Sequence, residues 1–276
     1  MGFLFRLLSR LPLPLLHNLG ALAGWLAYGL SPTYRRHLRE NMAQAGVENM
    51  RAVAIAEAGK TILELPKIWL RSQEEVVGRI ARITGREHVD AARAVGRGVL
   101  FLTPHLGCFE IIGRYLVSFR PFTALYRRPR QAWLGRLIEE GRGDCFKLAP
   151  ADLSGVRRMM KALKQNESVG ILPDQAPGAG EGLWAPFFRR PAYTMTLAAR
   201  LAGTGATVLL TYAERLPYGA GYHLHFQPLT APLEGDLPTR VARLNGELER
   251  LILECPEQYL WGYNRYKKPS GASNPT

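Results

Sequence analysis

The feature that most constrains the fold is an alternation between short apolar runs and longer amphipathic segments from residue 97 onward. The apolar runs have the length of buried strands: "GVLFLTP" (98–104), "FTALYR" (122–127), "CFKLAP" (145–150) and "SVGILPD" (168–174). Strands separated by helices of about ten to fifteen residues form a largely parallel sheet. We therefore expect an α/β fold, with a mostly parallel central sheet flanked by helices, in a single domain over residues 34–268.

Helical periodicity fills most of the remaining sequence. We expect helices within 34–75 and over 108–118, 129–142, 154–165, 194–205 and 239–259, with Ser154 as the N-cap of its helix. Residues 206–215 and 221–228 are predicted to form a strand pair, and residues 269–276 to be a disordered tail.

The N-terminus carries a long segment without charge. Residues 11–30 hold no charged side chain, and arginines lie on both sides, at Arg6, Arg10, Arg35 and Arg36. At about 1.5 Å per residue this segment could cross a bilayer core of about 30 Å. The apolar run continues past "ALAG" (21–24), which argues against a cleaved signal peptide. We expect residues 1–33 to be a membrane anchor, either spanning or lying in the interface, with a core helix as the alternative.

The charge balance predicts an anionic partner. Lys and Arg number 36 against 23 acids, for a net charge of +13, and such a field attracts nucleic acid, acidic proteins and phospholipid surfaces alike. The sequence has no zinc-finger spacing, no helix-turn-helix pattern and no interleaving of aromatic and basic residues, so we do not expect nucleic acid. Cys108, Cys145 and Cys255 form no C-x-x-C pair, which indicates reduced thiols and a body that faces the cytosol.

A histidine and an acid follow the first of these strands. His105 and Glu110 are five residues apart, and on one continuous helix they would lie about 140° apart, so they can meet only across a bend. Pro104 and Gly107 could supply that bend. A carboxylate that holds one ring nitrogen leaves the other as a general base. The alternative is that His105 caps a turn and Glu110 is a partly solvated helix residue.

Other strand ends carry polar side chains as well. Asp174 and Gln175 directly follow the strand at 168–174, and ligand-handling residues gather at the carboxyl ends of parallel strands. Asp174 is therefore the second candidate partner of His105, although aspartates are also common in turns. The guanidinium groups that we expect to bind phosphate are those of Arg127, Arg128, Arg130 and Arg142.

Two further chemistries remain as alternatives. Cys108 could act as a thiolate nucleophile paired with His105, although small buried cysteines are more common. His223 and His225 face the same way on a strand and could bind a metal, but no acid accompanies them locally and solvated histidines are the commoner case. We therefore expect no metal and no cofactor.

Four segments resemble one protein family in order and spacing. "TPHLGCFE" (103–110), "LPDQAPG" (172–178), "APFFRRPAYTMTLAARLAGTGATV" (185–208) and "CPEQYLWGYNRYKKP" (255–269) are similar to the bacterial lipid A biosynthesis lauroyl/myristoyl acyltransferases. These belong to the wider group of H-x4-D/E acyltransferases. The resemblance extends over residues 5–268.

The resemblance implies an inner-membrane enzyme with a glycerolipid acyltransferase-like fold and its catalytic body on the cytoplasmic side. It would move a fatty acyl chain from acyl carrier protein to a hydroxyl of a lipid A precursor, without a metal. His105 and Glu110 match the family's catalytic pair, and Asp174 matches a later acid that partners the histidine in some relatives. Arg142 matches a basic position of the substrate site.

The mechanism that we expect uses His105 as general base and Glu110 to orient its ring, with an oxyanion stabilised by backbone amides near Gly107 and Cys108. The groups expected to hold the substrate are Arg127, Arg130, Arg142 and Gln175.

The acceptor remains open. The family's C-terminal signature usually carries paired arginines where this sequence has Asn264 and Arg265. An ornithine lipid or a lysophospholipid is therefore an alternative acceptor, and a catalytically silent lipid-binding protein is an alternative function.

Overall fold

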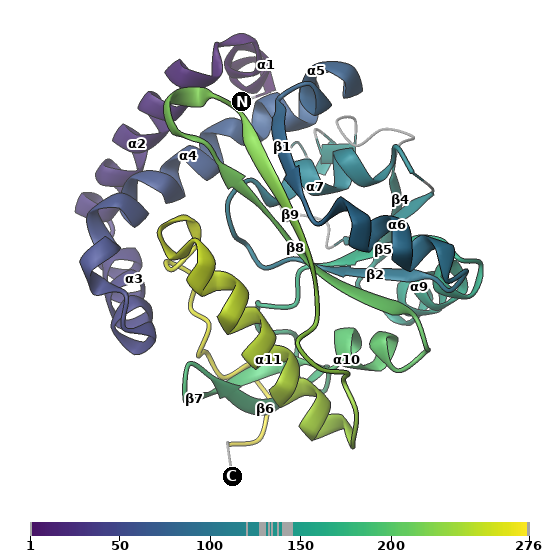
Figure 1. Ribbon diagram of the computed structural model, residues 1–276. Coiled ribbons are helices and arrows are strands. Elements are labelled where there is room, and N and C mark those ends of the chain that lie inside the picture. The colour runs from purple at the N-terminus through teal and green to yellow at the C-terminus, as the bar shows by residue number, and fades with distance from the viewer. Residues whose placement is uncertain are drawn as a thin grey trace.

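A seven-stranded sheet forms the centre of the computed structural model, which describes residues 2–119, 121–126, 131, 133, 135–136, 138–139 and 146–274 (Figure 1). The strand order is β1-β9-β8-β2-β5-β3-β4. Neighbouring strands run parallel except for the antiparallel pair β8–β9. The predicted mostly parallel sheet and the predicted strand pair are both confirmed. The strands are β1 Ile80–Thr84, β2 Val99–Leu102, β3 Phe122–Tyr126, β4 Phe146–Pro150, β5 Ser168–Ile171, β8 Thr207–Arg215 and β9 Tyr222–Pro228.

Helices cover both faces of this sheet, and strand β2 shows how the sequence requires them. Leu100 and Leu102 pack into a core shared with α9, α10 and α11, whereas Val99 and Phe101 pack on the other side with α6 and α7. An uninterrupted apolar strand is typical of a parallel sheet that is buried on both faces. The helices of this region are α5 Gln73–Val77, α6 Arg86–Ala94, α7 Phe109–Leu116, α9 Leu153–Lys164, α10 Leu197–Ala202 and α11 Leu237–Glu254.

Several local elements differ from those predicted. An antiparallel hairpin of β6 (Gly182–Phe187) and β7 (Arg190–Met195) precedes α10, so the helix predicted from residue 194 begins later. Strand β1 and helix α6 were not predicted. Helix α9 is capped by Asp152 rather than Ser154, because the Asp152 carboxylate accepts the backbone N–H groups of Ser154 (2.8 Å) and Gly155 (3.1 Å).

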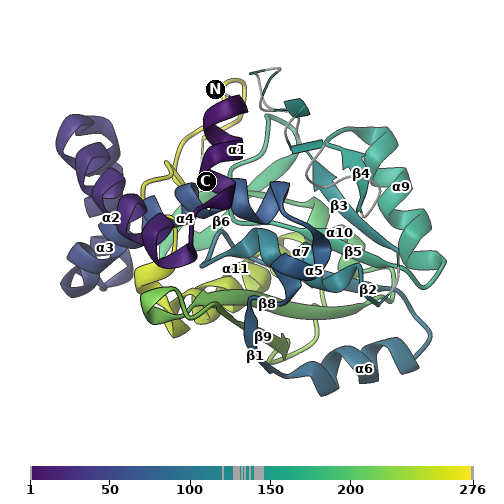
Figure 2. The ribbon, with the colours of Figure 1, turned by 90° about the horizontal axis from the view of Figure 1, so that it is seen from above.

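The N-terminal quarter is helical and lies to one side of the sheet, with α2 and α3 on the left in both views (Figures 1 and 2). Its elements are α1 Gly2–Arg10, α2 Leu13–Leu30, α3 Pro32–Ala45, the short 3-10 helix η1 Glu48–Met50 and α4 Arg51–Leu70. Two further 3-10 helices lie later in the chain, η3 Pro217–Gly219 and η4 Pro256–Gln258. Glycines bring α2 and α4 into backbone contact. A Cβ on Gly24 would lie 2.1 Å from the Ile55 carbonyl oxygen, and one on Gly59 would lie 1.9 Å from that of Gly20.

The structure does not support the spanning form of the anchor expected over residues 1–33, and the interfacial form stays a prediction. Of the helices in the described part of the chain, none combines the length and the apolar character needed to cross a bilayer. The charge-free segment forms α2 instead, and α2 uses one face to pack against α4. The buried residues of that face are Leu13, Leu16, His17, Gly20 and Gly24.

A buried charge network ties these N-terminal helices to the sheet. The Arg215 guanidinium of β8 donates to the carboxylates of Glu57 and Glu64 on α4, and His17 of α2 lies 3.2 Å from Glu64. Tyr222 of β9 also donates to Glu64, at 3.0 Å. Burial by itself raises the pKa of Glu64, but Arg215 and His17 outweigh it and lower the pKa from 4.5 to about 2. Glu64 is therefore ionised at neutral pH, and its charge depends on Arg215.

The substitution Arg215→Met is expected to lower the free energy of unfolding by about 3–5 kcal/mol, because it removes the arginine that pairs with the fully buried Glu64 carboxylate, whereas Glu57 keeps Lys60 as a partner. Arg250→Met is the matched control, since Arg250 also pairs with two acids, Glu247 and Glu254, but is 34% exposed. Its loss is expected to cost at most about 1 kcal/mol. Urea unfolding followed by circular dichroism measures both, and equal losses in the two variants would contradict this role of the network.

Candidate active site

The site forms where two neighbouring parallel strands end. Leu102 of β2 lies beside Ile171 of β5 in the strand register, and the pairing continues as Thr103 N–H donates to the Ile171 carbonyl at 3.1 Å. His105 and Asp174 each lie three residues beyond these paired positions. Strand register therefore brings together two residues that are 69 positions apart in the chain.

One carboxylate holds both the ring and the backbone of His105. The ring Nδ1 lies 2.8 Å from Asp174 Oδ1, and the His105 backbone N–H donates to Oδ2 at 2.9 Å. The other ring nitrogen, Nε2, lies 3.2 Å from the side-chain nitrogen of Gln175. An amide donor at Nε2 and a carboxylate at Nδ1 together favour the tautomer with its proton on Nδ1. The lone pair of Nε2 is then the basic position of the site.

Asp174 is kept ionised although it is only 1% exposed. Burial alone would raise the pKa of Asp174. The charge and the hydrogen bonds of His105 outweigh this effect, with a weaker contribution from Arg265, and lower the pKa below its ordinary value. Burial and the Asp174 carboxylate in turn raise the pKa of Tyr259, which stays a neutral phenol. Asp174 can therefore stabilise the positive charge that His105 acquires when it takes a proton.

The bend between His105 and Glu110 is present, but Glu110 does not hold the ring. Helix α7 begins at Phe109, and Gly107 turns the chain before it with φ of 60°. Among the described residues, the hydrogen bonds of the ring go to Asp174 and Gln175. Of the two acids that the sequence offered as partners of His105, Asp174 is the one that holds the ring in this structure. Glu110 lines the cavity beside the histidine, and its catalytic role stays a prediction.

The amides of Gly107 and Cys108 are themselves engaged elsewhere. Gly107 N–H donates to the Gln258 carbonyl at 3.1 Å, and Cys108 N–H donates to the Ala213 carbonyl at 2.8 Å. Both groups fasten the His105 loop to its surroundings, so an oxyanion would have to be bound by other amides near them, and that prediction stays untested. A Cβ at position 107 would lie 1.9 Å from the Ala213 oxygen, so only glycine fits there.

The structure contradicts Cys108 as a nucleophile. Its side chain is 1% exposed. Burial first, and the charge of Glu64 second, raise the pKa of the thiol well above its ordinary value. A reactive cysteine needs an accessible thiolate, and this one is a neutral core thiol.

The four arginines predicted to bind phosphate, Arg127, Arg128, Arg130 and Arg142, lie outside the residues that the structure describes, as does Cys145. Their contribution to substrate binding stays a prediction. Gln175, the remaining predicted substrate residue, contacts His105.

The C-terminal segment supports the site, and sequence reasoning missed this role. Leu260 N–H donates to the His105 carbonyl at 3.1 Å, and Gln258 holds Gly107. Arg265 is 2% exposed and donates to the Tyr193 carbonyl (2.8 Å) and to Thr194 Oγ1 (2.7 Å), close enough to Asp174 to lower its pKa. The segment "CPEQYLWGYNRYKKP" resembles the acyltransferase family, but nothing in its sequence indicates that it contacts the His105 loop.

A cavity of about 850 Å³ opens beside His105. This volume is within the range of about 300–1,000 Å³ that is typical of ligand pockets. Its apolar lining comes from α7, β3, α9, β7 and α10, through Phe109, Leu125, Leu153, Val156, Met195 and Leu197. Polar side chains line the cavity as well, among them His105, Glu110, Gln175 and Arg200, so an apolar chain held there can bring its reactive end to the histidine.

A mostly parallel sheet that presents a histidine, a buried aspartate and an apolar cavity at its strand ends is the arrangement of an α/β acyltransferase. Over residues 1–268 the chain matches the family described as bacterial lipid A biosynthesis acyltransferase, and it belongs to that family. It is therefore an acyltransferase.

Curated relatives agree with this assignment. The chain is 29% identical to the lipid A biosynthesis lauroyltransferase of Escherichia coli strain K12, over 96% of this chain and 90% of the relative. It is 27% identical to the palmitoleoyltransferase of the same organism, over 96% and 89%. A phosphatidylinositol mannoside acyltransferase of Mycobacterium tuberculosis is 28% identical, over 60% of this chain and 54% of the relative.

Proposed function

We propose that the protein transfers a fatty acyl group from acyl carrier protein to a hydroxyl of a lipid A precursor, as a late acylation step at the cytoplasmic side of the inner membrane. The observation that carries the proposal is the His105–Asp174 pair, whose histidine lines the largely apolar cavity. The acyl chain would lie in the cavity with its thioester carbonyl beside Nε2 of His105.

In this mechanism His105 Nε2 takes the proton of the acceptor hydroxyl as the oxygen attacks the thioester carbonyl. The acceptor displaces the Gln175 amide from Nε2, and Asp174 stabilises the imidazolium that forms. The carbon–sulfur bond then breaks, and the proton passes from His105 to the departing thiolate. The developing oxyanion would lie at the N-terminus of α7, which begins at Phe109 and has no side-chain cap from Cys108.

The net charge of +13 supports an acidic donor protein and a phosphorylated acceptor. Arg200 lines the cavity, and the phosphate-binding roles of Arg127, Arg130 and Arg142 are part of this proposal. No metal and no cofactor take part in the transfer.

The acceptor is the least constrained element, because relatives of this chain carry names with different acceptors. The test is to incubate the purified protein with isotopically labelled acyl carrier thioester and three acceptors together: a lipid A precursor, a lyso-ornithine lipid and a lysophospholipid. Mass spectrometry identifies the labelled lipid. Label in the lipid A precursor is the expected result, whereas label in another lipid, or turnover in none, would contradict this proposal.

Membrane association is supported by an apolar surface on α1 and α2. Opposite the face that packs on α4, α2 exposes an unbroken stripe, and α1 adds Phe3, Leu4 and Leu7. The α2 stripe comprises Leu15, Leu19, Leu22, Leu26 and Leu30, with Trp25 beside it. Arginines flank both ends of this surface, an arrangement that suits a helix lying in the interface of an anionic bilayer.

The double variant Leu22→Glu/Leu26→Glu is expected to bind phosphatidylglycerol vesicles at least about tenfold more weakly, because each leucine that enters the bilayer contributes about 1.5 kcal/mol or more. The matched control is Val95→Glu/Leu253→Glu, which replaces two exposed apolar residues far from α2 in the sequence. Vesicle flotation measures both. If the two double variants bind equally, α2 is not the contact surface.

A further inference from the structure

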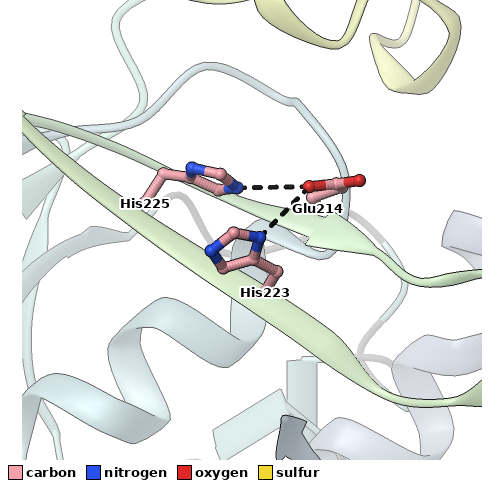
Figure 3. Close-up of side chains that lie close together, drawn as sticks. All are labelled: Glu214, His223 and His225. Carbon is pink, nitrogen blue, oxygen red and sulfur yellow. Dashed lines mark hydrogen bonds and ion pairs between the residues drawn. The ribbon is translucent and has the colours of Figure 1, made fainter. Parts of the chain in front are cut away.

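A second cluster of titratable side chains lies on strands β8 and β9, outside the site of acyl transfer (Figure 3). Glu214 of β8 pairs in register with His223 of β9, and His225 lies two residues further along the same strand. The two histidines lack an acid near them in the sequence, but the antiparallel pairing supplies one from the adjacent strand. All three side chains converge from the same face of the sheet.

The spacing of the three groups is that of ligands around one small cation. The Glu214 Oε2 atom lies 3.5 Å from His223 Nδ1 and 3.2 Å from His225 Nε2, and the three ligand atoms all lie within 4.8 Å of one another. In a tetrahedral zinc site with bonds of about 2.0–2.2 Å, neighbouring ligand atoms are about 3.3–3.6 Å apart. We propose that Glu214, His223 and His225 form a binding site for a divalent transition-metal ion, with zinc as the best match.

The surroundings hold both rings in place. Thr84 Oγ1 of β1 lies 2.8 Å from His223 Nε2, the ring nitrogen that does not face Glu214. Tyr212 stacks on His225, with ring centroids 4.3 Å apart and an angle of 2° between the planes. Metal-binding histidines are usually oriented by such a hydrogen bond to their second nitrogen. The site is therefore organised in advance, and little ordering is needed when the ion binds.

Charge and exposure are compatible with the ion. The Glu214 side chain is 34% exposed, which leaves an open side for a water molecule as fourth ligand. The positive charge of the nearby Arg82 opposes the binding of a cation. The Glu214 carboxylate acts in the opposite direction, because it neutralises part of the charge of the ion.

The location gives the ion a structural role. Glu214 lies between Ala213, whose carbonyl holds the His105 loop through Cys108, and Arg215 of the buried charge network. A metal bound to residues of both strands would fasten β9 to β8 at this point. It would raise the thermal stability without entering the acyl-transfer reaction.

The experiment measures zinc binding to the full-length protein, purified without a histidine tag, by isothermal titration calorimetry and by the shift in Tm. Wild type is expected to bind one zinc ion and to melt at a higher temperature when zinc is present. Cobalt in place of zinc is expected to give the visible absorption of a tetrahedral complex. Glu214→Gln and His225→Gln, which keep similar shapes, are expected to weaken zinc binding at least about tenfold. Thr84→Val is expected to weaken it about 10- to 100-fold through loss of the orienting hydrogen bond.

The matched control is His88→Gln, which removes a partly exposed histidine of α6 and is expected to bind zinc as wild type does. Three results would overturn the proposal: no zinc uptake by wild type, uptake that Glu214→Gln and His225→Gln leave unchanged, or binding of several ions that His88→Gln also reduces. Zinc binding and Tm do not depend on acyl transfer, so the result of this experiment is independent of the proposed function.

Discussion

The substitution His105→Ala is expected to lower kcat for acyl transfer about 10²- to 10⁴-fold, the range that a positioned general base contributes. The imidazole is the group that we place beside the acceptor hydroxyl, and without it the proton has no receiver at Nε2. KM for the acyl carrier thioester is expected to change little, because the acyl chain is held mainly by the apolar lining of the cavity. Steady-state kinetics with a radiolabelled thioester measures both constants.

The control for this variant is His88→Ala, which removes a histidine of α6 and is expected to keep full activity. Circular dichroism and thermal melting establish that His105→Ala is folded, since the His105 carbonyl also accepts a backbone hydrogen bond from Leu260 of the C-terminal segment. A folded His105→Ala protein with near-wild-type kcat would refute the assignment of His105.

The substitution Asp174→Asn is expected to lower kcat about 10³- to 10⁴-fold, up to the loss of about 10⁴-fold that follows when the orienting carboxylate of a serine protease triad is replaced by its amide. The amide preserves the shape of the side chain but removes the charge that stabilises the imidazolium, and its NH₂ group can donate to the ring and favour the wrong tautomer. KM is expected to stay nearly constant, because Asp174 is 1% exposed and acts through His105.

Glu110→Gln separates this account from the one first expected from the sequence. It leaves both bonds between Asp174 and His105 in place, so its effect on kcat is expected to be smaller than that of Asp174→Asn. If Glu110→Gln were the more damaging of the two, the acid that governs His105 during the reaction would be Glu110.

The sequence allowed the sheet and one half of the site to be predicted, because both depend on local signals. Apolar runs of strand length predicted β2, β5 and β8. Polar residues shortly after β2 and β5 indicated His105 and Asp174 as site residues. The choice between Glu110 and Asp174 was not available from spacing. It depends on β2 and β5 being neighbours with Leu102 beside Ile171, which is a property of the folded sheet.

In two places tertiary contacts overrode a local pattern. The charge-free segment before residue 31 had the length of a membrane span, but Gly20 and Gly24 let its helix pack against α4. The amides of Gly107 and Cys108 had the position of oxyanion donors, but carbonyls from Gln258 and Ala213 accept their hydrogen bonds. These carbonyls come from segments more than 100 residues away, which no local pattern around His105 could indicate.

The most direct test of the central claim, direct acyl transfer assisted by His105, is a single-turnover reaction. Excess protein is mixed with labelled acyl carrier thioester and a lipid A precursor, quenched at intervals, and analysed by mass spectrometry for acyl lipid, free fatty acid and acyl-protein. We predict that the label moves from the thioester to the lipid without a protein-bound intermediate, and that His105→Ala slows this step. Label on a Cys108 peptide, or release of label as free fatty acid at the same rate with and without the lipid, would contradict it.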